Sequence, residues 1–123
     1  MKNSPLVSVL CITYNQEKFI AQTIESFLKQ EINFSYEIVL SDDCSTDSTL
    51  EICKRYLKLN PGSIRILETE KNIGAQKNWY KAYNACNGKY IAVCEGDDYW
   101  TDPYKLQKQF NSICFHGFIN PFA

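Results

Sequence analysis

Four short apolar runs divide the chain, and each has the length of a β-strand. They cover residues 6–12, 36–40, 64–67 and 90–94. The first run is almost continuously apolar, which is typical of a strand buried on both faces, as in a parallel sheet. The pattern therefore predicts four largely buried strands.

Between and after these runs, apolar residues recur every three or four positions, the spacing of one face of a helix. Phe19, Ile20, Ile24, Phe27 and Leu28 show this spacing clearly. Helices are predicted over about residues 17–30, between residues 46 and 60, between residues 74 and 88, and from residue 102 onward. The last of these would begin with Asp102 as its cap and Pro103 in its first turn.

Strand and helix thus alternate four times, the pattern of an α/β fold with parallel strands. We expect a Rossmann-like open parallel sheet of about four strands, in the order 3-2-1-4, with flanking helices. Such a sheet reverses its topology between the first and fourth strands, and ligands bind there, outside the carboxyl ends of the strands. The expected domain covers residues 1–110, and residues 111–123 are expected to form an irregular tail.

The most polar segments of the chain all follow predicted strands. They contain Thr13, Tyr14 and Asn15 after the first strand, Asp42 and Asp43 after the second, and Glu95, Asp97 and Asp98 after the fourth. Because the carboxyl ends of parallel strands meet at one edge of a sheet, these side chains are candidates for a common site.

Three acids lie within four residues after the fourth strand. Acids this close repel one another unless a hard cation such as Mg²⁺ lies among them, often shared with substrate phosphates. A polar loop that caps the next helix is the alternative, although Asp102 already supplies that cap. Gly96, between Glu95 and Asp97, leaves room for a ligand to approach the backbone.

The other strand ends keep two interpretations each. Asp42 and Asp43 either form turn and capping hydrogen bonds or bind a base N–H or a ribose hydroxyl. Tyr14 either ends its strand or stacks on a planar ring. Trp100 belongs to the core or to a lid, whereas Trp79 and Tyr83, at helical spacing, are expected in the core.

Composition narrows the class of protein. The net charge is −1 and Lys and Arg form no dense run, which argues against nucleic acid as the main partner. No apolar stretch approaches the ~20 residues that span a bilayer, and the N-terminus lacks a signal-peptide pattern. We therefore expect a cytoplasmic protein.

The six cysteines form no C-x-x-C pair, so buried reduced thiols are expected rather than disulfides or a zinc site. Neither a G-x-G-x-x-G sequence nor a P-loop is present. If phosphates bind, a metal rather than a glycine-rich loop must hold them.

Four segments together resemble the nucleotide-sugar-binding half of family 2 glycosyltransferases. They cover residues 8–15, 37–47, 72–74 and 95–100, and the resemblance extends over about residues 6–110. It implies a GT-A architecture and inverting transfer from a nucleotide-diphosphate sugar, most often a UDP-sugar, to a saccharide or lipid-linked acceptor. Mn²⁺ or Mg²⁺ is the implied cofactor, and cell-surface polysaccharide biosynthesis is the implied setting.

The resemblance also assigns roles by position. Thr13, Tyr14 and Asp43 would contact the base, and Asp97 would contact the ribose or sugar. Asp98, with Asp97 as a second ligand, would hold the metal that bridges the diphosphate. The remaining residues of the implied donor site are Asn15, Asp42, Gly74 and Glu95. Glu95 departs from the family pattern, which has an aspartate at this position of its D-x-D-D motif.

Residues 111–123 contain no Asp or Glu, whereas the family places an acidic general base in a following acceptor-binding half. We therefore expect a truncated donor-binding half that transfers little alone. A non-enzymatic remnant is one alternative, and half of a partner-completed enzyme is another. A partner chain or a second copy that covers the exposed sheet and peripheral attachment to the inner membrane face also stay open.

Overall fold

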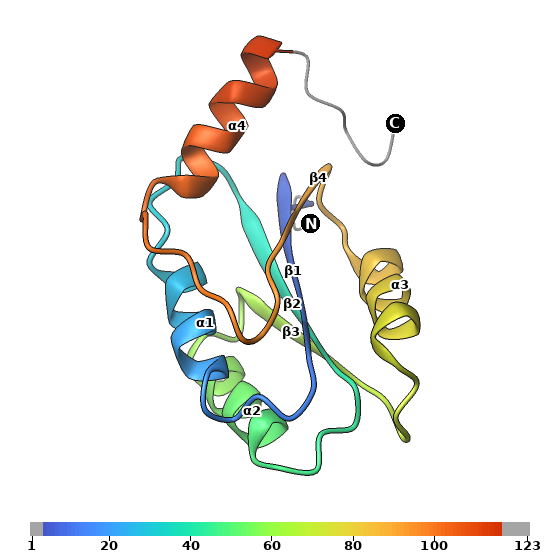
Figure 1. Ribbon diagram of the computed structural model, residues 1–123. Coiled ribbons are helices and arrows are strands. Elements are labelled where there is room, and N and C mark those ends of the chain that lie inside the picture. Colours follow the sequence, from blue (N-terminus) through green and yellow to red (C-terminus); the bar gives the residue numbers. More distant parts are fainter. Residues whose placement is uncertain (1–3, 117–123) are drawn as a thin grey trace.

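The computed structural model describes residues 4–116, with side chains as far as residue 112. Its elements are β1 (Val7–Thr13), α1 (Ile20–Leu28), β2 (Tyr36–Asp42), α2 (Thr49–Leu59), β3 (Ile64–Glu68), α3 (Ala75–Ala85), β4 (Tyr90–Val93) and α4 (Lys105–His116). The strands form one parallel sheet in the order β3-β2-β1-β4 (Figure 1). The predicted fold class and strand order are confirmed.

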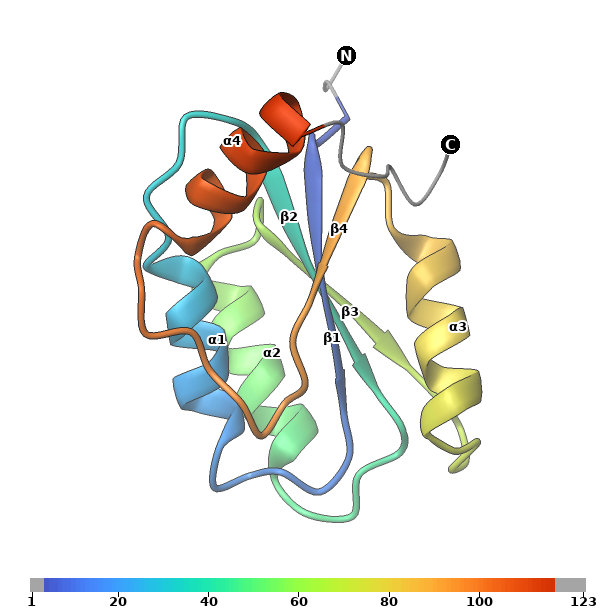
Figure 2. The same ribbon diagram turned by 45° about the horizontal axis from the view of Figure 1, so that its top comes forward.

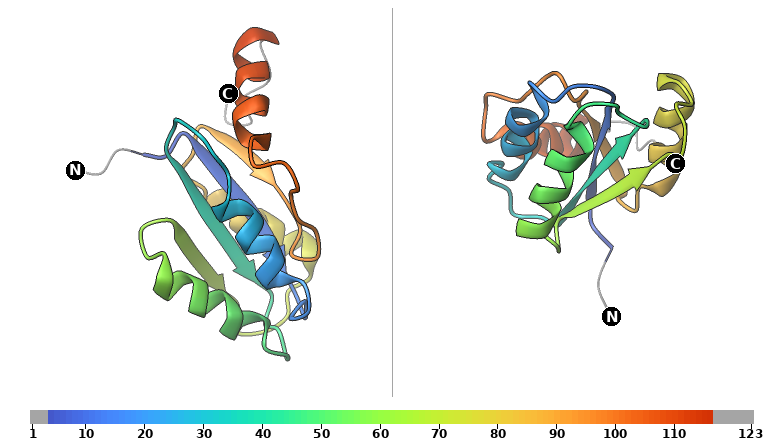
Figure 3. Two further views of the ribbon diagram at one scale, coloured as in Figure 1. Left: turned by 90° about the vertical axis from the view of Figure 1, so that its left-hand side faces the viewer. Right: turned by 90° about the horizontal axis from the view of Figure 1, so that it is seen from below.

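Helices cover both faces of the sheet. Figure 2 shows α1 and α2 on one face of the sheet and α3 on the other. Helix α4 lies above α1, at the amino ends of the strands. The view from below in Figure 3 separates the same layers. This arrangement follows from the strands, because successive side chains of a strand point to opposite faces.

Two apolar clusters correspond to the two faces. The larger one joins β1 and β2 to the helices α1, α2 and α4, with Phe27 and Leu106 among its buried members. The smaller one joins Leu10 and Val39 to Ala82 and Cys86 of α3. Burial of both strand faces explains why the apolar runs in the sequence are nearly continuous.

The structure shows where Trp100, Trp79 and Tyr83 pack. Trp100 packs on Phe27, with ring centroids 4.8 Å apart, and contacts the larger cluster, so it belongs to the core rather than to a lid. Trp79 and Tyr83 stack on one face of α3 with centroids 5.2 Å apart and pack against the smaller cluster. The prediction that they lie in the core is confirmed.

Helix α4 continues to His116, six residues beyond Phe110, where the irregular tail was expected to begin. Leu106, Phe110 and Ile113 follow helical spacing into this segment, and no Pro or Gly interrupts it before residue 117. Gln107 also donates to Asn111 one turn later (3.1 Å), a contact that supports a helix. Residues 117–123 of the expected tail lie outside the described residues.

The sheet has an unpaired edge at β4. Within residues 4–116 β4 pairs only with β1, and Val93 is 49% exposed at its end. None of the helices in this part of the chain is long and apolar enough to cross a membrane.

The described cysteines are free thiols, as predicted. Cys11, Cys53, Cys86 and Cys94 are buried, and Cys44 is partly exposed. Burial raises the pKa of Cys53 to about 12 and that of Cys94 to about 11, so these thiols stay protonated at neutral pH. The side chain of Cys114 lies outside the described residues.

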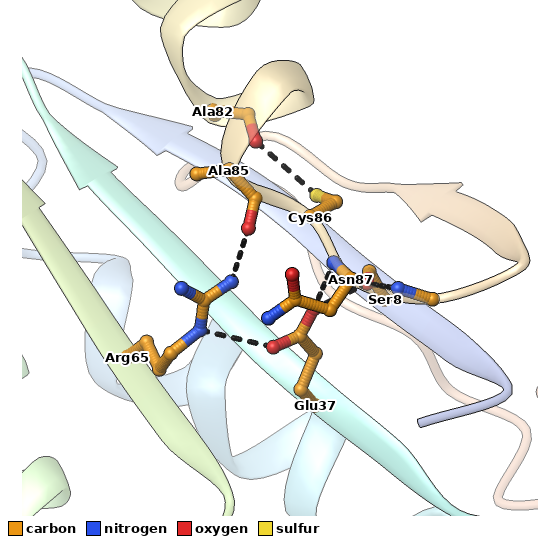
Figure 4. Close-up of polar contacts among 8 residues, drawn as sticks. Ser8, Glu37, Arg65, Ala82, Ala85, Cys86 and Asn87 are labelled. Carbon is orange, nitrogen blue, oxygen red and sulfur yellow. Dashed lines mark hydrogen bonds and ion pairs between the residues drawn. The ribbon is translucent and has the colours of Figure 1, made fainter. Parts of the chain in front are cut away.

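A buried carboxylate ties together the amino ends of three strands (Figure 4). Glu37 of β2 accepts hydrogen bonds from Arg65 Nε of β3 (2.9 Å), from Ser8 Oγ of β1 (2.5 Å) and from the backbone N–H of Asn87 (2.7 Å). Arg65 also donates to the carbonyl of Ala85, the last residue of α3. The network therefore locks the C-terminus of α3 onto the sheet.

Replacement of Glu37 by Gln should lower the free energy of unfolding by about 2 kcal/mol, because an amide cannot satisfy all three donors and Arg65 loses its partner. Glu51→Gln, at an exposed position in the first turn of α2, is the control and should change it by less than about 0.5 kcal/mol. Urea unfolding followed by circular dichroism measures both. Equal stabilities of the two variants would contradict the assignment of Glu37 as a buried anchor.

Candidate functional site

A cavity of about 340 Å³ opens at the carboxyl ends of the strands. Its lining includes five residues predicted from the sequence: Thr13, Tyr14, Asp43, Gly74 and Glu95. The ends of β1 and β2 and the start of α3 form its walls, and the segment after β4 closes one side. The pairing of Thr13 with Asp42 brings the first two strand ends together.

Asp43 is buried, with 3% of its surface exposed, and its carboxylate connects β2 to the loop before α3. One oxygen accepts the backbone N–H of Ile73 (2.7 Å), and the other accepts that of Gly74 (2.9 Å). Its own N–H donates to the carbonyl of Thr13 (3.0 Å). Each carboxylate oxygen keeps a further lone pair that could accept a ligand N–H.

Gly74 precedes α3 with φ 91° and ψ 155°. This backbone conformation is essentially restricted to glycine, because a side chain would strain it. It allows the loop to turn its N–H toward Asp43 before the helix begins. Gly74 therefore shapes the cavity wall through its backbone.

Asn15 and Asp42 do not line the cavity, although the sequence placed both in the site. The side chain of Asn15 accepts hydrogen bonds from the backbone N–H groups of Thr46 (2.7 Å) and Asp47 (3.3 Å). Asp42 accepts from the backbone N–H (2.9 Å) and the hydroxyl (2.5 Å) of Ser45. In this structure both side chains hold the loop between β2 and α2.

Tyr14 and Thr13 form the mouth of the cavity with Gln16. The Tyr14 side chain is available to a ligand, since the residue is 44% exposed. The hydroxyl of Thr13 donates to Gln16 Oε1 (2.7 Å), and the backbone N–H of Gln16 donates to Thr49 Oγ1 (2.8 Å). The loop after β1 is thus fixed to α2.

We name residues 95–98 the acid loop. The N–H of Asp98 donates to the carbonyl of Glu95 (3.0 Å), which closes a turn with Gly96 and Asp97 at its centre. The carboxylate of Asp98 accepts the N–H of Tyr99 (2.8 Å). Glu95 lines the cavity, whereas Asp97 and Asp98 are exposed just beyond it.

Gly96 is the one buried residue of the acid loop. Its N–H donates to the carbonyl of Ile12 (3.1 Å), so the loop continues the pairing of β4 with β1. A Cβ added here would lie 2.8 Å from Thr13 Oγ1 and closer still to Gln16 Oε1. Only glycine allows the acid loop to pack this closely against the end of β1.

The exposed acids fit one mode of divalent-metal binding. No group of three potential metal ligands is assembled among the described residues. Mg²⁺ is commonly held by one or two carboxylates together with substrate phosphates and water, a mode for which no complete protein cage is needed. Asp97 and Asp98 have the right donor chemistry for that role, and both are exposed.

Two further polar residues line the cavity and were not placed in the site from the sequence. Asn78 of α3 is buried, and its side chain exchanges two hydrogen bonds with Ser41: its amide donates to the Ser41 carbonyl (2.9 Å) and accepts the Ser41 hydroxyl (2.5 Å). Asn72 donates to the carbonyl of Asp43 (3.2 Å). The sequence contains one indication of Asn78: it is a polar residue on the face of α3 that packs against the sheet.

A glycosyltransferase family accounts for this combination of sheet, cavity and acid loop. Residues 8–121 match the model of glycosyl transferase family 2, and the chain belongs to that family. It is 38% identical over 105 residues to the putative teichuronic acid biosynthesis glycosyltransferase TuaG of Bacillus subtilis, an alignment that covers 85% of this chain and 40% of TuaG.

Two solved structures show the same fold. Residues 1–349 of TarS from Staphylococcus aureus, in complex with UDP, match with a TM-score of 0.81 and 32% identity over 90% of this chain and 32% of that one. The mannosyltransferase PcManGT of Pyrobaculum calidifontis, in complex with GDP-Man and Mn²⁺, matches with a TM-score of 0.82 over 91% of this chain and 33% of that one. The latter is 21% identical and supports the GT-A-type fold alone.

The chain spans only part of its relatives. It covers 34 to 40% of the length of two curated proteins that it matches, an uncharacterized protein of Mycobacterium tuberculosis and TuaG. More than half of each of these two relatives has no counterpart in residues 1–123.

Replacement of Gly74 by Ala should lower the free energy of unfolding by about 1–3 kcal/mol, because alanine strains the backbone at φ 91°. Gly62→Ala is the matched control, since a Cβ there meets nothing within 4 Å and its φ is not in the positive region. Urea unfolding of the two variants separates strain from a general effect of removing glycine. Similar losses in both would argue against strain at Gly74.

Proposed function

We propose that the chain is the donor-binding part of a glycosyltransferase and binds a nucleotide-diphosphate sugar together with Mn²⁺ or Mg²⁺. The observation that carries this proposal is the cavity at the strand ends, with Asp43 and Tyr14 on one side and the acid loop on the other. TarS binds UDP and UDP-GlcNAc, and PcManGT binds GDP-Man, in the complexes named for them. A UDP-sugar is the first candidate, since TarS is the more similar in sequence.

The base would occupy the inner part of the cavity. A free lone pair of the Asp43 carboxylate would accept a base N–H, and the exposed ring of Tyr14 would stack on the base. Thr13 would contact the same group from the end of β1. Asn15, Asp42 and Gly74 would act indirectly, through the loops that they hold.

The acid loop would face the sugar and the diphosphate. Asp97 would contact the ribose or the sugar, Asp98 would hold the divalent cation, and Glu95 would border the donor at the cavity wall. The cation, when bound, supplies positive charge that neutralises the diphosphate as it leaves. The carboxylates of the acid loop would position the cation, so no glycine-rich phosphate loop would be needed.

Transfer itself would require a further acidic group. Of the two described acids that line the cavity, Asp43 already accepts two backbone hydrogen bonds, and Glu95 is assigned to the donor with the rest of the acid loop. We propose that residues 1–123 alone transfer little, and that an acceptor-binding part completes a saccharide or lipid-linked acceptor site. Its setting would be the cytoplasm or the inner face of the membrane.

A non-enzymatic role is the second candidate. The free edge of β4 and the exposed Val93 favour it, because an uncovered sheet edge invites pairing or aggregation. A partner chain that covers this edge would instead restore a working enzyme. A soluble monomer that melts in one sharp transition would count against the non-enzymatic candidate, and scanning calorimetry with light scattering makes that test.

Isothermal titration calorimetry with UDP, GDP and CMP, each with and without Mn²⁺, tests the donor site. We expect binding of at least one nucleoside diphosphate that tightens when Mn²⁺ is present, because Asp98 and the phosphate oxygens would share the cation. CMP, which has a single phosphate, should gain less from the metal. If no nucleotide shows metal-dependent binding, the proposed donor site is wrong.

The variant Asp98→Asn should weaken Mn²⁺-dependent nucleotide binding by at least about tenfold, since even outer-shell changes at metal sites cost that much. Metal-free binding should change little. Glu51→Gln, at an exposed position of α2 that does not line the cavity, is the charge-matched control. The same calorimetric titrations measure all three proteins, and an unchanged metal dependence in Asp98→Asn would remove this residue from the cation site.

A further inference from the structure

Thr23 of α1 is completely buried and lies directly against the acid loop. Its hydroxyl is within hydrogen-bond distance of the carbonyl oxygens of Gly96 (3.1 Å) and Asp98. A third carbonyl near it, that of Phe19 (3.2 Å), already accepts the backbone N–H of Thr23. The hydroxyl has one proton and donates to one carbonyl at a time, and two of the three carbonyls within its reach belong to the acid loop.

The two acid-loop carbonyls near the Thr23 hydroxyl belong to Gly96 and Asp98, which lie on either side of Asp97 in the sequence. Because both turn toward the same buried hydroxyl, the loop must curl around it, and Asp97 remains exposed. The N–H of Gly96 is bound to Ile12 of β1 at the same time. The shape of the acid loop is thus set by α1 and β1, whereas its carboxylates stay free for a ligand.

The same face of α1 also holds the chain that follows the acid loop. Phe27 packs on Trp100, and the side-chain amide of Gln30 donates to the carbonyl of Asp102 (2.9 Å) and accepts the N–H of Leu106 (2.9 Å). Thr23 and Phe27 lie one turn apart on α1, and Gln30 follows two residues after the helix ends at Leu28. These three side chains fix the segment on both sides of the exposed acids.

We propose that Thr23 is a positioning residue for the metal-binding carboxylates of the acid loop. The inference rests on the proposed donor function and adds a residue outside the segments that resemble the family. Mg²⁺ requires nearly ideal octahedral geometry, so a small shift of Asp97 or Asp98 weakens a site shared with phosphates. A hydroxyl on a packed helix prevents that shift without contacting the ligand.

The test compares wild type, Thr23→Val and Thr23→Ser by calorimetry with UDP, with and without Mn²⁺. Thr23→Val keeps the volume but removes the hydroxyl, and should weaken Mn²⁺-dependent binding about fivefold to tenfold, the usual worth of one such hydrogen bond. Metal-free binding should stay the same, and Thr23→Ser should restore most of the metal dependence. A purely structural role would not separate metal-dependent from metal-free binding.

A second readout needs no ligand. Hydrogen exchange of the peptide covering residues 95–99 should be faster in Thr23→Val than in wild type, because the Asp98 amide loses its fixed turn. Ser26→Ala is the control: it removes another buried hydroxyl from α1, whose hydrogen bond goes to the Thr23 carbonyl (2.6 Å) and not to the loop. If Thr23→Val does not fold, Thr23→Ala also removes the hydroxyl and does not place a methyl group against the loop carbonyls.

The outcomes separate the two proposals. If wild type shows metal-dependent binding and the Thr23 variants match it in binding and exchange, Thr23 does not position the acid loop. If wild type shows no metal-dependent binding, the donor function fails and the inference fails with it. Reduced metal dependence in Thr23→Val together with rescue by Thr23→Ser supports the inference.

Discussion

The buried carboxylate of Asp43 is the contact on which the carboxyl end of the sheet depends. It joins the end of β2 to the start of α3, while its backbone N–H holds the end of β1 at Thr13. The negative charge also lies at the N-terminus of α3, where the helix dipole favours it. Three segments that line the cavity thus meet at one residue, and its negative charge is compensated without a basic side chain.

The two ends of the sheet have different physical roles. At the amino end, Glu37 and Arg65 form a closed network in which each carboxylate oxygen has a protein partner. At the carboxyl end, the buried polar atoms hold loops in place, and the exposed carboxylates of Asp97 and Asp98 are left for other ligands. Gly74 allows the loop at the carboxyl end to adopt a backbone conformation that a residue with a side chain could reach only with strain.

The order of the strands and the position of the cavity at their carboxyl ends could be predicted, because both follow from hydrophobic periodicity and from the geometry of parallel sheets. The sequence could not predict that Asp43 lines the cavity whereas Asp42 binds the loop after β2. Adjacent acids look alike in the sequence, and the pleat turns their side chains to opposite sides. Thr23 gave no signal, because its partners are backbone carbonyls more than 70 residues away. The helical residues 111–116 were missed although Ile113 and Cys114 continue the helical spacing of Leu106 and Phe110.

The side of the sheet on which α4 packs limits how the sheet can grow. Leu106 places α4 with α1 and α2, opposite α3, although β4 lies on the far side of β1 from β2. A parallel strand that followed α4 and paired with the free edge of β4 would need a left-handed crossover, an arrangement that proteins almost never adopt. A strand added at that edge by the chain after α4 would therefore run antiparallel, so the sheet would change from parallel to mixed at β4.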